Sequence, residues 1–183
     1  MDANMEVWKL IVSALTPAAI AGAGYFINKA LSTREHELSM LRSKQEIRKQ
    51  IYDEIGSKLN QIFCFVCDVG DFGYYEPPHI IHLKRDIDRK FEVYKTLWHK
   101  RTLDAYEKFM GSSFDTYSGG PGTPAKICAS LNEKQAFFSR VGKQWKSEWN
   151  AMFTVPMDKN TLFTLYDNLV EAFVNDITSD RPV

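Results

Sequence analysis

The sequence lacks the motifs that identify common catalytic sites. Its glycine-rich segment, Ser118 to Gly122, contains a proline and no lysine, so it does not match a phosphate-binding loop. No arrangement of serine, histidine and acid indicates a nucleophilic centre. The three cysteines are an odd number, which suits a reducing compartment better than a secreted disulfide scaffold. We therefore expect no catalytic residues, no bound metal and no cofactor.

Long hydrophobic runs are also scarce, and only one stretch resembles a membrane span. Leu10 to Asn28 is uncharged and lies between Lys9 and Lys29. In a helix, these nineteen residues would extend for roughly the thickness of the hydrocarbon layer of a bilayer. Trp8 and Tyr25 lie near its two ends, where amphipathic rings favour the interface. We therefore predict an N-terminal transmembrane helix, with Trp8, Lys9, Tyr25 and Lys29 as interfacial anchors.

Two other interpretations of this stretch stay open. A buried core helix of this length usually carries charges on one face, and none occur here. A cleavable signal peptide would explain the small residues Ala21 to Ala23, which resemble a cleavage site. Asp2 and Glu6, however, leave the leading segment without the positive charge of a signal peptide. The pattern favours the anchor.

Basic residues near the two ends of the stretch predict its orientation. The N-terminal side has only Lys9, which Asp2 and Glu6 offset. Because positively charged flanks stay in the cytoplasm, we expect a single-pass protein of the inner (cytoplasmic) membrane. Its anchor would cover residues 1–31, and its cytoplasmic domain residues 32–183. The basic residues after the stretch are Lys29, Arg34, Arg42, Lys44, Arg48 and Lys49.

Small residues recur within the predicted anchor. Ala14, Ala18 and Gly22 follow one another at four-residue spacing and form one stripe along a helix. Such stripes let helix backbones approach closely in lipid, although Ala and Gly are common in membrane helices for other reasons. Pro17 predicts a kink. We predict that the chain forms a homo-oligomer through this stripe.

The rest of the chain has helical periodicity and no strand-like alternation. The first helix restarts or continues at Ser32 and ends near Gly70; the second runs from Pro78 towards Phe109. A third follows a capping box at Ser130 and extends to Phe153, and a fourth begins at Asp158. We predict an all-α fold, with an N-terminal transmembrane helix followed by a four-helix cytoplasmic bundle.

Positive charge is concentrated in two segments, although the formal net charge is zero. Residues 84–101 hold seven basic and three acidic residues, and residues 134–146 hold four basic and no acidic ones. Basic helix faces can bind RNA, anionic lipid or a protein partner. Solvated faces with i,i+4 ion pairs, such as Lys84 with Asp88, are the simpler interpretation.

Four residues have the spacing of a zinc site. Cys64 and Cys67 form one pair, and His79 and His82 another, each at i,i+3 on a helix. A helical hairpin would bring two thiolates and two imidazoles together, which is a tetrahedral ligand set. The apolar neighbours of the cysteines instead indicate ordinary buried thiols, and we predict no metal.

The architecture resembles a known family. An anchor, a long connecting helix and a helical bundle in a chain of this length are similar to the small membrane accessory proteins of type VI-B CRISPR systems. That resemblance implies a HEPN-like bundle, assembly into membrane pores, a functional link to an RNA-guided RNase and a role in antiviral defence. The HEPN nuclease signature is an arginine followed by four to six residues and then a histidine. His36, His79, His82 and His99 lack it.

We weigh three functions against these observations. The first is a membrane-anchored, pore-forming oligomeric effector in contact with the lipid bilayer. The second is a membrane-tethered adaptor that binds a protein or RNA through its basic helix faces. The third, a nuclease, is disfavoured by the missing signature. We predict that the chain is not an enzyme.

Overall fold

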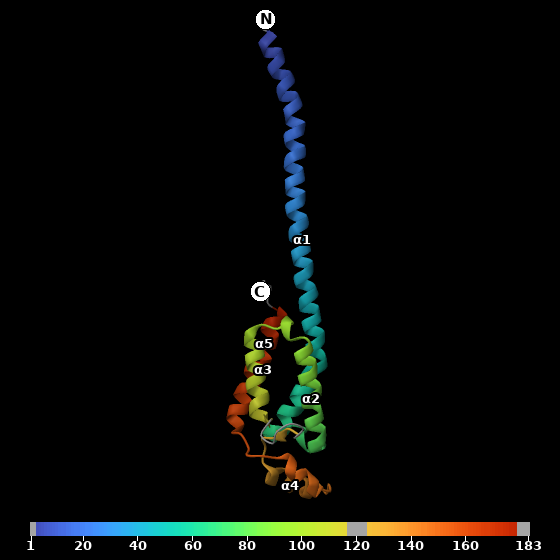
Figure 1. Cartoon of the computed structure of the whole chain (residues 1–183), viewed down its shortest axis with the longest axis vertical. Coiled ribbons are helices and arrows are strands. Elements are labelled where there is room, and N and C mark those ends of the chain that lie inside the picture. The colour runs from blue at the N-terminus through green and yellow to red at the C-terminus, as the bar shows by residue number, and fades with distance from the viewer. Residues whose placement is uncertain (1–2, 117–123, 179–183) are drawn as a thin grey trace. The chain divides into compact units, whose positions relative to one another are not determined.

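The computed structural model describes residues 3–116 and 124–178, and it describes side chains from Gly24 onward. It divides into two units, one that ends at Ser43 and one that begins at Lys44. Helix α1 (Ala3–Cys67) contributes to both units, and every other described element belongs to the second (Figure 1).

The structure contradicts the predicted membrane span. No helix is long and apolar enough to cross a bilayer in the part of the chain that the structure describes. From Gly24 onward, charged side chains recur along α1, beginning with Lys29, Arg34 and Glu35. A spanning helix needs about 20 consecutive, predominantly apolar residues. The predicted transmembrane helix and the predicted location as a single-pass membrane protein are therefore wrong.

Most of the predicted anchor residues are not among those whose side chains the structure describes. Ala14, Ala18 and Gly22, together with Trp8 and Lys9, lie outside that set, so their predicted contacts with lipid and with other copies are not tested. The backbone is one uninterrupted helix through Pro17. Tyr25 and Lys29 are both exposed.

The second unit is a helical bundle, as predicted. Helices α2 (Pro77–Val93), α3 (Lys100–Ser113) and α5 (Lys159–Thr178) pack with the last turns of α1 around one hydrophobic core (Figure 1). In α1, the inward positions recur every three or four residues, which places them on one face of the helix. Each of these residues is at most 3% exposed: Ile51, Ile55, Leu59 and Ile62.

Phe173 of α5 lies at the centre of this core. Its side chain is fully buried, and its ring lies 5.1 Å from that of Tyr52 on α1 and 6.1 Å from that of Phe91 on α2. The ring of Trp98 approaches it edge-on at 5.0 Å. Aromatic rings from three helices and a connecting segment therefore meet at one residue.

The predicted second helix is two helices in the structure. α2 ends at Val93, the 3-10 helix η2 (Lys95–Leu97) follows, and α3 begins at Lys100. Trp98 and His99 between them have extended backbones. The extended segment brings Trp98, 5% exposed, onto Phe91 and Phe173. No proline or glycine marks this break, and the burial of Trp98 is one of the tertiary contacts that account for it.

The predicted third helix is shorter than expected. α4 (Leu131–Arg140) begins at its predicted cap, where the backbone N–H of Glu133 donates to Ser130 Oγ at 3.3 Å. It ends before Gly142, whose φ of +70° is a left-handed conformation that favours glycine. The 3-10 helix η3 (Ser147–Met152) follows instead of further α-helix. α4 lies at one end of the bundle rather than among its long helices (Figure 1).

Short elements complete this end of the second unit. The two-residue strands β1 (Phe114–Asp115) and β2 (Lys126–Ile127) pair antiparallel, and the 3-10 helix η1 (Phe72–Tyr74) follows α1. The predicted cap of the last helix is confirmed, because the backbone N–H of Thr161 donates to Asp158 Oδ2 at 2.8 Å.

Candidate functional site

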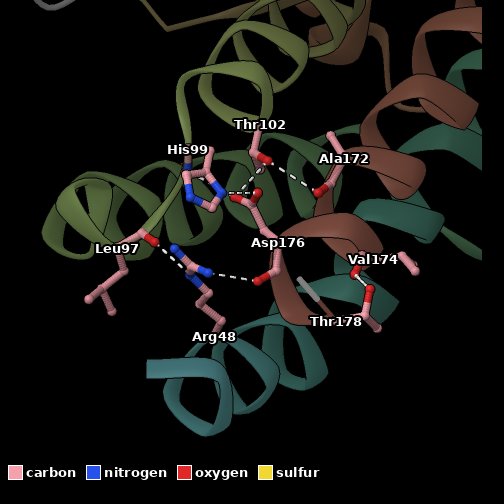
Figure 2. A network of polar contacts seen from close by, with 8 residues as sticks. All are labelled: Arg48, Leu97, His99, Thr102, Ala172, Val174, Asp176 and Thr178. Atoms are coloured by element: carbon pink, nitrogen blue, oxygen red, sulfur yellow. Dashed lines mark hydrogen bonds and ion pairs between the residues drawn. The ribbon is translucent and has the colours of Figure 1, made fainter. Parts of the chain in front are cut away.

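A buried polar network joins α3 to α5 (Figure 2). Its centre is the carboxylate of Asp176, a residue that is 4% exposed. Oδ2 accepts hydrogen bonds from the backbone N–H of His99 at 2.9 Å and from Thr102 Oγ1 at 2.8 Å. Oδ1 lies 2.6 Å from Nδ1 of the His99 ring. A side chain of α5 thus caps the N-terminus of α3, where backbone N–H groups lack partners within their own helix.

Arg48 extends the network to α1. Its side chain is buried, Nε donates to the carbonyl of Leu97 at 2.6 Å, and Nη1 donates to the carbonyl of Asp176 at 2.7 Å (Figure 2). These carbonyls end η2 and belong to the last turn of α5, where helices leave acceptors without partners. The network therefore holds the ends of three helices together.

The pairing of His99 with Asp176 has the geometry of a general-base dyad. A carboxylate at Nδ1 orients an imidazole so that Nε2 can accept a proton, and the His99 side chain is 28% exposed. No other side chain hydrogen-bonds the His99 ring among the described residues. The other contacts of the Asp176 carboxylate, to the backbone N–H of His99 and to Thr102 Oγ1, hold the N-terminus of α3 against α5.

The first basic segment, residues 84–101, is largely neutralised by ion pairs. The predicted pair of Lys84 with Asp88 forms at 2.5 Å. Arg101 reaches Glu171 on α5 at 2.7 Å, and Lys90 pairs with Glu54 on α1. Lys95 pairs with Glu92, and Lys100 pairs with Asp104 one turn further along α3. This face of α2 and α3 therefore offers little unpaired charge.

The second basic segment, residues 134–146, is different. Arg140 lies over the Phe137 ring at 5.2 Å, Lys143 over the Tyr74 ring at 5.1 Å, and Lys146 over the Trp149 ring at 5.2 Å. Within the described ranges, no carboxylate pairs with any of the three cations. All three are exposed, and so is Tyr74, at 77%. We call Tyr74, Phe137, Arg140, Lys143 and Lys146 the α4 surface.

The fourth basic residue of this segment, Lys134, is buried and acts structurally. Its ammonium binds the carbonyl of Phe65 and the carboxylate of Asp68, and it lies over the rings of Phe65 and Phe72. Burial lowers the pKa of Lys134, and the Asp68 carboxylate opposes that shift. Asp68 itself has a left-handed backbone, with φ of +58°. The pair joins α4 to the end of α1.

A hollow of about 450 Å³ adjoins the α4 surface. It is lined by aromatic, basic and acidic side chains, and we call it the Phe137 hollow. The ring of Phe137 packs so closely on Gly73 that a Cβ at that position would lie 1.8 Å from it. Glycine is therefore needed for this packing. The lining residues are Asp68, Phe72, Glu133, Ala136, Phe137, Arg140 and Lys159.

The cysteine and histidine pairs do not form a metal site. His79 Nε2 lies 3.2 Å from Gln61 Oε1, and the exposed His82 faces Asp86 at 3.5 Å. Cys67 is buried, and burial raises the pKa of its thiol to about 11. No group of three or more potential ligands is positioned to hold a metal among the described residues.

Comparison with known proteins identifies no relative: no family model, no curated protein and no solved structure matches the chain. The resemblance to accessory proteins of type VI-B CRISPR systems therefore stays a prediction, and so does the HEPN-like nature of the bundle. The charge of residues 134–146 is visible in the sequence. Tyr74 is not predictable in the same way, because it lies sixty residues before Lys134 and carries no motif.

Proposed function

We propose that this chain is a non-catalytic adaptor that binds single-stranded RNA through the α4 surface. The observation that carries the proposal is the set of three exposed cations, each over an aromatic ring and none paired with a carboxylate among the described residues. The cations of residues 84–101 mostly have carboxylate partners, so we choose the α4 surface over that face as the binding site.

The chemistry of the α4 surface suits an unpaired nucleic-acid strand. Lys and Arg neutralise phosphates, and the release of counterions drives such binding. Aromatic rings and guanidinium planes stack on bases that are not already stacked in a duplex. Tyr74 offers an exposed ring, and Arg140 offers a guanidinium plane at the surface. Three exposed cations beside one exposed ring suit a phosphate-bearing strand better than a smooth apolar partner.

The non-catalytic part of the proposal rests on the role of the His99–Asp176 pair. The carboxylate is committed to the N-terminus of α3 and to Thr102, so the imidazole is held as part of a helix joint. We expect the purified protein to leave RNA intact. A homo-oligomer and a functional link to an RNA-guided RNase stay predictions.

Fluorescence anisotropy with a labelled 12-nucleotide oligo-uridine tests the proposal. We expect the triple variant Arg140→Gln/Lys143→Gln/Lys146→Gln to bind at least tenfold more weakly than the unmodified chain. Each lost phosphate contact also lowers the dependence of log affinity on log salt by about 0.7, so three contacts should lower it by about 2.

A matched triple variant controls for net charge. Lys95→Gln/Lys100→Gln/Arg101→Gln removes the same three charges from the ion-paired face of η2 and α3. Its affinity should stay within about threefold of the unmodified chain, because these cations already have carboxylate partners. An equal loss of affinity in both triples would show non-specific attraction and contradict the proposal, as would an unmodified chain that binds no RNA.

A further inference from the structure

The Phe137 hollow combines three features that a site for one nucleobase requires. Its volume of about 450 Å³ lies within the range of small-molecule sites. Phe72 and Phe137 form its aromatic wall, with ring centroids 4.5 Å apart. Arg140 lines the hollow and also belongs to the α4 surface, so a strand bound at that surface passes the opening of the hollow.

The two carboxylates that line the hollow, Asp68 and Glu133, differ in how accessible they are to a ligand. Lys134 binds Asp68 Oδ1, and Lys159 Nζ lies 2.8 Å from Oδ2 as an ion pair. Glu133 Oε2 accepts from Lys159 Nζ at 3.0 Å, and the Glu133 carboxylate also lies within hydrogen-bonding reach of the Asp68 carboxylate. The Glu133 side chain is 53% exposed, against 12% for that of Asp68. Glu133 is therefore the acceptor that a ligand in the hollow can reach.

The wall of the hollow favours a flat ligand. The guanidinium of Arg140 lies 5.2 Å above the Phe137 ring, and close packing on Gly73 fixes the other side of that ring. Bases stack on aromatic side chains and on arginine planes alike. A base that enters from the α4 surface can therefore stack on Arg140 and present its edge to Glu133.

We propose that the Phe137 hollow is a subsite for a guanine base of the bound strand, read by the carboxylate of Glu133. This inference rests on the proposed RNA binding. Guanine presents two adjacent donors, N1–H and the N2 amino group, to a carboxylate that only accepts. Uracil has one ring donor, N3–H, between two carbonyl groups, and the oxygens of these carbonyls repel a carboxylate. The carboxylate therefore selects for guanine.

Four labelled nine-nucleotide RNAs test the subsite by fluorescence anisotropy. All are oligo-uridine, and three of them carry guanosine, inosine or adenosine at the central position. We expect the guanosine strand to bind about tenfold more tightly than plain oligo-uridine, the size expected for a bidentate contact to a base. Inosine, which lacks the N2 amino group, should lose most of this gain.

Substitution at the hollow then assigns the preference to Glu133. In Glu133→Gln the guanosine strand should bind as oligo-uridine does, while the affinity for oligo-uridine stays within about twofold. Glutamine keeps the shape and the N-terminal position of the side chain in α4, and the circular dichroism of each variant checks that it folds. Glu148→Gln removes an exposed carboxylate of η3 that does not line the hollow, so it should keep the guanosine preference.

The outcomes separate the subsite from the proposed function. Equal binding of all four strands by the folded, unmodified chain would overturn the guanine subsite and leave RNA binding in place. A guanosine preference that survives in Glu133→Gln would likewise overturn the proposal that the Glu133 carboxylate recognises guanine. Failure of every strand to bind would overturn both the subsite and the proposed function.

Discussion

At the scale of single residues, the contact between Gly73 and Phe137 shows how a residue without a side chain can determine the geometry of the Phe137 hollow. Gly73 is buried, and the Phe137 ring occupies the space of its missing side chain. Nothing in the local sequence marks Gly73 as different from the glycine at 70, three residues before it. Its importance arises only because α4 returns over η1.

We predict that Gly73→Ala destabilises the protein by about 1 to 3 kcal/mol, because the new methyl group forces the Phe137 ring away. In a Phe137→Ala background the same substitution should cost much less, since the space is then empty. Urea unfolding of the four members of this double-mutant cycle measures the coupling. Additive costs would show that the two residues do not interact.

Gly111 provides the matched control. It lies within α3, and a Cβ at this position meets no atom within 4 Å. Because glycine in a helix interior is less favourable than alanine by about 0.5 to 1 kcal/mol, Gly111→Ala should stabilise the protein. The two glycine substitutions should therefore have opposite signs.

At the scale of secondary-structure elements, the buried side chains of Arg48 and Asp176 bind backbone groups at the ends of helices. Arg48 satisfies carbonyls of η2 and α5, and Asp176 satisfies the N-terminus of α3. Helix ends within a core must find such partners, because unpaired backbone groups are costly to bury. The network thus fixes the ends of these elements relative to one another.

We predict that Asp176→Ala lowers the free energy of unfolding by about 3 kcal/mol. The substitution leaves a buried N–H, a buried hydroxyl and an imidazole without their acceptor. Glu171→Ala is the control on the same helix. It removes an exposed ion pair with Arg101 between the same two helices and should cost less than about 1 kcal/mol. Comparable losses in urea unfolding would contradict the assignment of Asp176 as the joint.

At the scale of the whole molecule, the hydrophobic core belongs to the second unit. The buried residues that α1 contributes begin at Arg48 and Ile51. Upstream, between residues 24 and 43, large apolar side chains such as Phe26 and Leu31 are exposed, at 72% and 53%. The boundary at Ser43 therefore coincides with the point where α1 begins to contribute to the core.

We predict that a chain of residues 44–183 folds on its own, with cooperative thermal unfolding and unchanged affinity for RNA. A chain of residues 51–183 loses Arg48, which donates to the partly buried carbonyl of Leu97 and the buried carbonyl of Asp176, so its Tm should fall by several degrees. Circular dichroism at 222 nm distinguishes the two truncations. A loss of cooperative unfolding in the 44–183 chain would show that the first unit is needed for folding.

The sequence by itself determined the features that depend on neighbours along the chain. The three- and four-residue spacing of Ile51, Ile55 and Leu59 determines one buried helix face, and Ser130 and Asp158 determine where two helices begin. The i,i+4 pair of Lys84 with Asp88 was likewise predictable. Each of these rests on helix geometry within about one turn.

The tertiary structure decided what depends on residues far apart in sequence. Asp176 lies 77 positions from His99, and Tyr74 lies 69 positions from Lys143, so no local pattern links either pair. The break between α2 and α3 depends on the burial of Trp98 and on the contacts of Arg48 and Asp176 there. The third helix begins where predicted but ends earlier, at Arg140. Ion pairing depends on distance in space rather than along the chain. Carboxylates far away in the sequence, such as Glu54 and Glu171, therefore decide which basic segment keeps unpaired cations.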